Sequence, residues 1–227
     1  MKHGKRYLEN AKKVDATKAY TVDEAIQLVK GFSDGKFDET VELVLHLGVD
    51  PKKPEQALRG TISLPKGIGR TLRVIAFAEG EQAAKAKAAG ADEAGGQELI
   101  DKIQNGWLDF DVAIAAPAMM RQVGRLGRIL GPKGLMPSPK SGTVSEDVEG
   151  AVREFKAGKM EYRTDASGNV HAPVGKKSFS AEDLKANIEA FIERIRQAKP
   201  AGVKGRYILG TAVSTTMGPG IPLAVSS

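Results

Sequence analysis

The sequence predicts an α+β domain with an antiparallel sheet, built from both ends of the chain, and an α/β domain inserted between them. Three observations favour this fold class. Residues 71–156 alternate between short apolar runs and amphipathic stretches, the pattern of a parallel sheet with helices on both faces. The flanking segments contain half-buried alternating strands instead. Residues 68–158 hold 12 basic and 12 acidic residues, so the whole formal charge of +6 lies in the flanks.

These observations set the predicted boundaries. We expect a discontinuous domain of residues 1–67 and 159–227, with residues 68–158 inserted in it. Two crossings of the chain, near residues 64–69 and 158–160, would then form a two-strand hinge.

The N-terminal segment predicts two helices and two strands. Residues 3–15 form a short basic helix whose cations either face solvent or contact phosphate, and the sequence leaves both alternatives open. Thr21 and Glu24 have the spacing of a capping box, and the apolar stripe that follows places the second helix in the core. Leu43, Leu45 and Leu47 then alternate with polar residues as in a half-buried strand, and residues 60–65 form another strand.

The middle of the chain predicts buried strands separated by helices. The helix that follows the 124–140 loop is expected to take Ser145 as its N-cap. The strands are predicted at residues 72–78 and 110–115, and the helices at residues 81–89, 97–104, 121–130 and 145–156.

The C-terminal segment returns to the first pattern. Residues 160–164 and 169–174 flank Asp-Ala-Ser-Gly and predict a hairpin. Ser180 is expected to cap a helix with an apolar core face. Residues 207–216 alternate as a strand rich in small and hydroxyl residues, which would give a flat, sterically open surface.

Composition excludes several classes of protein. No apolar run approaches the roughly 20 residues of a membrane span, and the N-terminus lacks the apolar region of a secretory signal. The absence of cysteine rules out disulfides and thiolate chemistry. His3, His46 and His171 have no metal-binding spacing, and no nucleophile elbow occurs, so we predict no catalytic residue, metal or cofactor. A pI near 9.4 weakly indicates a polyanionic partner.

The most distinctive stretch is GRLGRILGPKGLMPSPK at residues 124–140, which carries four cations and no acid. Its glycines and prolines predict a long ordered loop after a helical first half. It is not a P-loop: Gly127 and Gly131 enclose three residues instead of four, and Pro132 has no N–H for a phosphate.

Continued to residue 144, this stretch resembles the signature of the large ribosomal subunit protein L-one family, whose members belong to the mobile stalk beside the tRNA exit site. Further matches in the same order extend the resemblance over nearly the whole chain. They are HGKRY at residues 3–7, KFDETVEL at 36–43, HAPVGKKSF at 171–179 and TTMGPG at 215–220.

The resemblance implies a fold, a function and partners. The fold would be a discontinuous α+β domain with an inserted Rossmann-like three-layer domain. The protein would bind the stalk rRNA of the large subunit, assist release of deacylated tRNA, and repress translation of its own operon mRNA. The implied partners are large-subunit rRNA, that mRNA and exit-site tRNA, with no membrane, in the cytoplasm and on the ribosome, and as a monomer off it.

The resemblance also implies the RNA-binding residues, and their chemistry suits RNA. Cations neutralise phosphates, Phe37 and Met217 offer apolar contacts, hydroxyls bond 2′-OH groups, and carboxylates accept from base amino groups. Phe37 by itself would equally suit a core position, and the resemblance favours stacking. The set is Lys36, Phe37, Thr40, Glu42, Arg163, Asp165, Ser167, Gly168, Ser214, Thr216, Met217 and Gly218.

Three questions stay open on the sequence alone. Lys52, Lys53 and Arg59 lie in a polar loop that is either simply solvated or faces exit-site tRNA. The 124–140 loop could instead have a structural role at the face between the domains, with Arg125 and Arg128 capping carbonyls or pairing with acids. The alternative function is a nucleotide-dependent enzyme that uses the inserted α/β domain, although no Gly-x-Gly-x-x-Gly follows its first strand.

Overall fold

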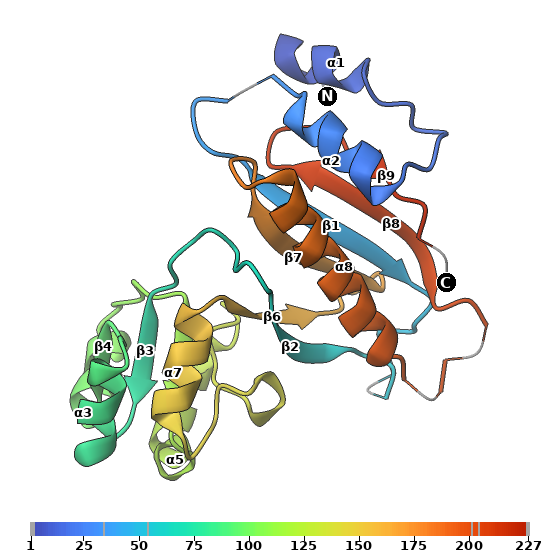
Figure 1. Cartoon of the computed structure of the whole chain (residues 1–227). Helices are drawn as coiled ribbons and strands as arrows, with labels where there is room; N and C mark the ends of the chain where they lie inside the picture. The colour runs from blue at the N-terminus through green and yellow to red at the C-terminus, as the bar shows by residue number, and fades with distance from the viewer. Residues whose placement is uncertain (1–2, 34, 54, 201, 204, 226–227) are drawn as a thin grey trace. The chain divides into compact units, whose positions relative to one another are not determined.

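The computed structural model describes the chain except for residues 1–2, 34, 54, 201, 204 and 226–227 (Figure 1). The chain forms two compact units, one of Met1–Gly69 with Tyr162–Ser227 and one of Arg70–Glu161. The first unit contains an antiparallel sheet and the second a parallel one, which confirms the predicted mixture of sheet types. That the units are domains with separate roles stays a prediction.

The main sheet of the first unit joins the two ends of the chain. Its strands are β1 (Thr40–Leu47), β7 (Asn169–Lys176), β8 (Ile208–Thr215) and β9 (Ile221–Pro222). The order is β7-β1-β8-β9 and every pairing is antiparallel. The leucines predicted to point inward from β1 are buried, as the alternation requires.

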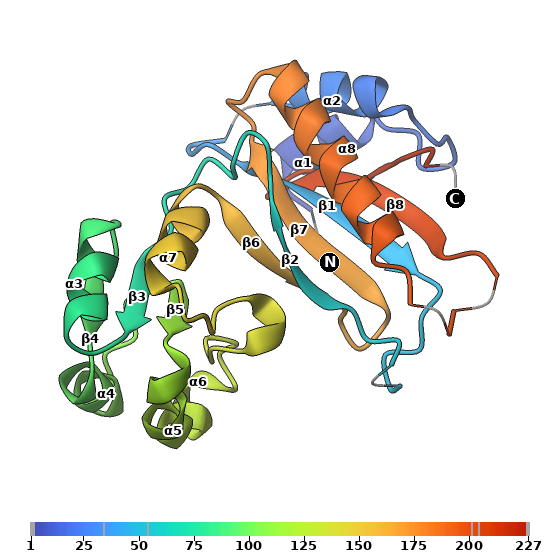
Figure 2. The same cartoon turned by 60° about the horizontal axis from the view of Figure 1, so that its bottom comes forward.

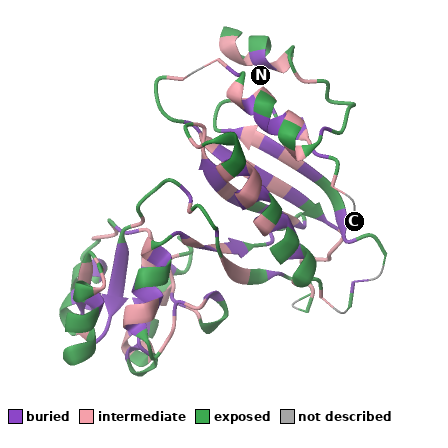
Figure 3. Ribbon diagram, viewed as in Figure 1, coloured by how far each residue is buried: buried purple, intermediate pink, exposed green. Residues whose placement is uncertain are grey.

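Three helices accompany this sheet: α1 (Lys5–Ala11), α2 (Val22–Lys30) and α8 (Ala181–Gln197). The predicted capping box of α2 is present, and the Ser180 side chain accepts the Asp183 N–H at the start of α8. Helices α2 and α8 pack together against one face of the sheet (Figures 1 and 3). On the other face, the side chains of β1 and β8 stay partly exposed.

The predicted hairpin of residues 160–164 and 169–174 is wrong. Strand β6 (Lys159–Arg163) pairs with β2 (Arg59–Ser63) in a separate two-stranded sheet, whereas β7 pairs with β1 (Figure 2). The turn transfers the chain from one sheet to the other, and its two sides are joined by the Thr164–Val170 bridge and by the hydrogen bond from Asp165 N–H to Asn169 O at 2.8 Å. Thr164 is also hydrogen-bonded to Leu58, through its N–H and its hydroxyl.

The alternation predicted for residues 207–216 holds only in part. Thr211, Val213 and Thr215 are buried, but Leu209, expected on the same face, is 44% exposed. The pairing of β1 with β8 shifts register between His46 and Leu47, and this irregularity changes which residues face inward.

The second unit has a three-stranded parallel sheet in the order β4-β3-β5. Figures 1 and 2 show α3 and α7 on one face and α4 and α5 on the other. The strands are β3 (Val74–Phe77), β4 (Glu93–Gly95) and β5 (Val112–Ala115); the helices are α3 (Glu81–Ala88), α4 (Gln97–Gln104), α5 (Met120–Val123), α6 (Gly127–Leu130) and α7 (Val148–Lys156), with 3₁₀ turns η1 (Pro117–Met119), η2 (Gly124–Leu126) and η3 (Pro139–Ser141).

Three details of this unit differ from the prediction. Strand β4 was not expected, because Glu-Ala-Gly has no apolar run. The helix expected over residues 121–130 is a series of short α and 3₁₀ pieces. Asp147, not Ser145, is the N-cap of α7, since its carboxylate accepts the Gly150 N–H at 2.8 Å.

Candidate nucleic-acid interface

The structure divides the predicted RNA-binding residues into two groups. Thr40 begins β1 opposite Lys176, and His46, near the far end, lies opposite Asn169. At about 3.3 Å per residue, the ends of β1 are about 23 Å apart. We name the group at the start of β1 the Thr40 end: Lys36, Phe37, Thr40, Glu42, Ser214, Thr216, Met217 and Gly218.

The second group is Arg163, Asp165, Ser167 and Gly168, and we name its position the Leu47 end. Leu47 N–H donates to Gly168 O at 3.0 Å, which holds this turn at the opposite end of the strand. The twelve predicted residues therefore lie in two groups, and their binding of RNA stays a prediction. The reason is the antiparallel pairing of β1 with β7, which places the start of β7 at the end of β1.

At the Thr40 end, Thr40 and Thr216 hold the ends of β1 and β8 together. Thr40 N–H donates to Thr216 Oγ1 at 3.0 Å, and Thr216 N–H donates to Thr40 O at 3.0 Å. The pairing continues along the open face of the sheet, where Glu42 lies opposite Ser214. Hydroxyls from two distant segments are thus fixed side by side.

Phe37 and Met217 are the exposed apolar side chains at this end. Their exposed fractions are 54% and 52%, which excludes the core position considered for Phe37. Both lie beside the Thr40–Thr216 pair in sequence, and Lys36 next to Phe37 is exposed too. A cation, a ring and a thioether at one strand end suit stacking and phosphate contact together.

Glu39 organises this end, and sequence reasoning missed it. It is only 4% exposed, yet its Oε1 lies 3.2 Å from Arg6 Nη2 and its Oε2 accepts the Met217 N–H at 3.3 Å. Arg6 of α1 is therefore tied to the Met217 turn by one buried carboxylate. The only sequence signal for Glu39 was its position in the motif KFDETVEL. A single acidic residue in a motif does not show that it contacts Arg6 and Met217, which are distant in the sequence.

Lys176 is a second residue that sequence reasoning missed. Its Nζ donates to Thr40 Oγ1 at 2.8 Å, so a cation reaches the centre of the Thr40 end. The register of β7 on β1 places it there. The motif HAPVGKKSF contains Lys176, but only the strand pairing shows that it faces Thr40.

Gly218 has a structural reason to be glycine. Its N–H donates to Thr215 O at 3.0 Å in the turn after β8. A Cβ at this position would lie 2.4 Å from Thr215 Oγ1 and 3.2 Å from the Phe32 ring. Close packing inside the protein therefore accounts for this glycine, whatever approaches from outside.

At the Leu47 end, Asp165 forms the centre of the turn. Its carboxylate accepts the Asn169 and Ser167 N–H groups, both at 2.8 Å, and the Asn169 side-chain amide at 3.1 Å. These bonds, those from Asn169 above all, lower the pKa of Asp165 to about 2; nearby His171 adds to the effect. Gly168 has φ +82° and is buried, so it too serves the turn. Both residues are explained without RNA.

The cations at the Leu47 end are more informative. Arg59 and Arg163 flank the bonded pair Leu58–Thr164 on neighbouring strands, and both are exposed. Lys52 and Lys53 are exposed in the loop before β2, with Asp50 close to Lys53 Nζ at 3.9 Å. Arg163 therefore lies with the residues predicted to face tRNA, and away from the Thr40 end.

The second unit offers little to a nucleotide. A hollow of about 570 Å³ lies where β3 and β4 end and α3 and α4 begin. Glu79, Glu98 and one cation, Lys87, line it, and a Cβ on Gly96 would lie 3.1 Å from Glu79 Oε1. Two carboxylates at this position would repel the phosphates of a nucleotide.

Metal-binding clusters and membrane-spanning helices are both absent from the described residues. No group of three or more His, Asp or Glu side chains is placed to hold a metal ion. Among the described helices, none has both the length and the apolar character needed to cross a membrane.

Comparison with known proteins agrees with the geometry. The sequence model of the ribosomal protein L1p/L10e family matches residues 29–219. The chain is 58% identical over 222 residues to large ribosomal subunit protein uL1 of Kosmotoga olearia, and equally so to the proteins of that name from Lactobacillus johnsonii and Lactobacillus gasseri. Each comparison covers 98% of this chain and 96% of the relative. The resemblance and the non-enzymatic class predicted from the sequence are confirmed, and the enzyme alternative is set aside: the chain belongs to the ribosomal protein L1p/L10e family.

Proposed function

We propose that this protein binds the stalk rRNA of the large ribosomal subunit through the Thr40 end of its first unit. Family membership makes it a non-enzymatic protein of the ribosome in the cytoplasm. The observation that carries the choice of surface is the exposure of Phe37 and Met217 beside the bonded pair Thr40–Thr216. Isolated exposed apolar residues are common, but two of this size beside fixed hydroxyls and lysines form an RNA-binding surface.

The roles at the Thr40 end follow from chemistry. Lys36 and Lys176 neutralise phosphates, Phe37 stacks on a base, and Met217 packs on a base or sugar. Thr40, Thr216 and Ser214 hydrogen-bond 2′-hydroxyls, and Glu42 accepts from a base amino group. Because a carboxylate repels phosphate, Glu42 adds discrimination between RNA sequences instead of general affinity.

Met217→Asp tests this assignment. It places a charge that repels phosphate where an apolar contact is proposed, and it should weaken binding of a stalk rRNA fragment by about 10- to 100-fold, the scale of one lost stacking contact. Leu209→Asp is the matched control, because Leu209 lies on β8 and is also exposed, at 44%, but belongs to the Leu47 side of the strand. Filter binding at fixed salt measures both. Equal losses in the two variants would contradict the assignment.

We also infer that the Leu47 end contacts exit-site tRNA as deacylated tRNA leaves. Lys52, Lys53, Arg59 and Arg163 gather there, and cations on a polar loop and strand ends suit phosphates without base recognition. The support is their common position in the structure, which the sequence alone did not reveal for Arg163.

Repression of the protein's own operon mRNA follows as a proposal from the same Thr40 end. A surface that reads RNA shape binds a second RNA with the same local structure. Met217→Asp should then weaken mRNA and rRNA binding by similar factors. Off the ribosome we expect a monomer that binds one RNA at a time at this surface.

A further inference from the structure

The second unit carries a cationic face that its zero net charge conceals. Between Asp111 and Glu146 the chain has no acidic residue, yet it has five cations there. They are Arg121, Arg125, Arg128, Lys133 and Lys140, and all five are exposed.

Among the described residues, these five cations and Lys87 are the cations of the unit that have no partner. Within the described residues, none of their side chains forms an ion pair or a hydrogen bond, so no carbonyl cap or acid partner of Arg125 or Arg128 is seen inside this unit. A structural role of this loop at the face between the domains stays a prediction. Elsewhere in the unit, cations are paired except for Lys87: Arg70 and Arg73 with Asp111, Lys85 with Glu81, Lys102 with Glu93, Arg153 with Glu149, Lys156 with Asp92 and Lys159 with Glu154.

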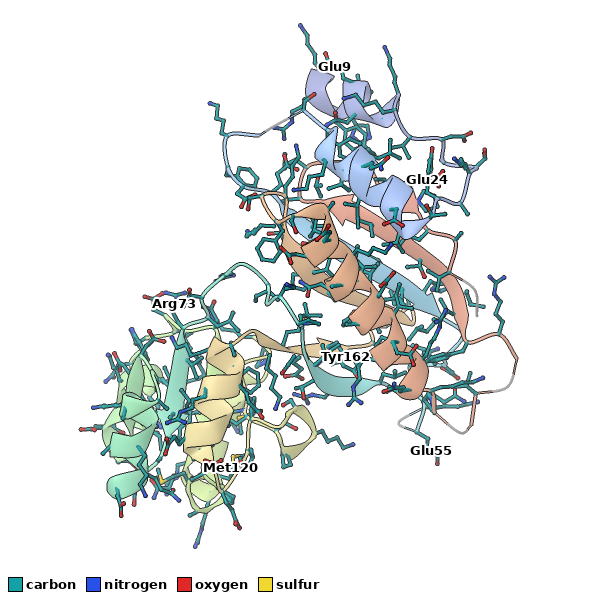
Figure 4. The ribbon with its side chains drawn as sticks, viewed as in Figure 1. Glu9, Glu24, Glu55, Arg73, Met120 and Tyr162 are labelled. Atoms are coloured by element: carbon teal, nitrogen blue, oxygen red, sulfur yellow. The ribbon has the colours of Figure 1, made fainter. Side chains whose placement is uncertain are left out.

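The three arginines lie along one face of a helical run. Residues 117–130 are continuous short helical pieces, and Arg121, Arg125 and Arg128 recur at the i, i+4, i+7 spacing of a single face. The buried side chains Met119, Val123, Leu126 and Leu130 recur at the same spacing on the opposite face and join the core. The packing beneath it therefore turns the arginine face outward; Met120, which is labelled in Figure 4, belongs to this helical run.

The segment is held firmly at both ends. It leaves the end of β5 and returns beside it, where Ala115 N–H donates to Thr143 O at 2.9 Å and Ser145 N–H donates to Ala115 O at 3.2 Å. The helical run itself ends in a Schellman motif, with Leu135 N–H on Leu130 O and Gly134 N–H on Gly131 O, both 3.0 Å. The backbone that carries these cations therefore loses little conformational freedom when they bind.

Two glycines, Gly124 and Gly127, flank the arginine face, and no side chain projects from them. A Cβ built on Gly124 or Gly127 would meet nothing within 4 Å, so the backbone is open to close approach. No aromatic side chain and no acid accompany the cations from residue 112 to residue 145, so aromatic rings that stack on bases and carboxylates that accept from base amino groups are missing. A surface of unpaired cations on open backbone suits the regularly spaced phosphates of a nucleic-acid backbone. Contacts to phosphates alone do not distinguish one base sequence from another.

We propose that this arginine face docks on the phosphate backbone of an RNA duplex, as a second contact with the RNA that the first unit recognises. The inference rests on the proposed function for the nature of its partner. It lies in the other unit, however, so a test of Met217 and a test of the arginine face can fail separately.

The test compares two triple variants of the full chain. Arg121→Gln, Arg125→Gln and Arg128→Gln together remove the face. Lys85→Gln, Lys102→Gln and Arg153→Gln remove the same charge from ion-paired positions of the same unit. The probe is a 20-base-pair RNA duplex of arbitrary sequence, titrated at several salt concentrations. Removing the face should lower the slope of log K against log salt by about 2 to 3, nearly one per lost phosphate contact, and the control by less than about 1.

Equal slopes in the two variants would overturn the proposal. Poly-glutamate serves as a second probe. If removal of the face weakens binding to poly-glutamate but leaves duplex binding unchanged, the surface docks acidic protein and the RNA assignment is wrong. Stalk rRNA binding measured with Met217→Asp reports on the first unit alone, so its outcome separates failure of the proposed function from failure of this inference.

Discussion

Thr216 and Met217 are neighbours in the chain, but their side chains contribute to the Thr40 end in different ways. Thr216 Oγ1 already accepts the Thr40 N–H, so replacing Thr216 by an apolar residue would alter strand pairing as well as binding. The side chain of Met217 is half exposed, and its main chain, not its thioether, is held by Glu39. Met217 is therefore the better residue for separating RNA binding from stability.

The pH dependence of stability can be predicted for Asp165. Its pKa falls from 3.8 to about 2 on folding, because the carboxylate accepts hydrogen bonds from Asn169 and Ser167. A lowered folded-state pKa stabilises the protein fully above about pH 4, and this contribution is lost as the pH falls towards 2. Asp165→Asn should unfold at a lower temperature than the wild type at pH 6, and the difference should disappear near pH 2.

Thermal unfolding followed by circular dichroism between pH 2 and pH 7 measures this effect. Glu182→Gln is the control, because Glu182 is an exposed carboxylate without a bonded partner among the described residues. A difference between Asp165→Asn and wild type that stays constant down to pH 2 would show that the carboxylate charge is not the cause.

At the scale of single elements, local chemistry decided much of what could be predicted. Capping residues and apolar stripes located α2 and α8, because the caps at Thr21 and Ser180 act within four residues. Strand β4 escaped prediction, since three residues carry too little pattern. The pairing of β6 with β2 also escaped, because the turn at Asp165–Gly168 looks the same in the sequence whether its strands pair together or separate.

The segment of the arginine face allows a matched test at this scale. Gly124 has helical angles and open space around it, so Gly124→Ala should stabilise the protein by about 0.5–1 kcal/mol. Gly134 has φ +72° in the Schellman motif, so Gly134→Ala should destabilise it by about 1–2 kcal/mol. Urea unfolding measures both free energies. If both substitutions changed the free energy of unfolding in the same direction, the difference in backbone conformation between Gly124 and Gly134 would not control their effect on stability.

At the scale of the whole molecule, the sequence indicated that the two ends of the chain belong together but not how the site residues are shared between the ends of the sheet. The charge distribution and the change of pattern near residues 67 and 159 were sufficient for the first conclusion. The second depends on strand register, which is set by pairings between residues more than 100 positions apart. Long-range contacts of the same kind place Lys176 and Glu39 at the Thr40 end, which is why the sequence alone did not identify them.

The separation of the Thr40 end from the Leu47 end predicts independent binding of two RNAs to the first unit. About 23 Å between the ends of β1 exceeds two Debye lengths at physiological salt, so charges at one end have little effect at the other. Changing Lys52, Lys53 and Arg163 together to Gln should weaken tRNA binding by about tenfold or more and leave stalk rRNA affinity within about twofold. Met217→Asp should do the reverse, and saturating stalk rRNA should not displace labelled tRNA in a competition assay. Displacement, or parallel losses in the two variants, would mean that one continuous surface binds both RNAs.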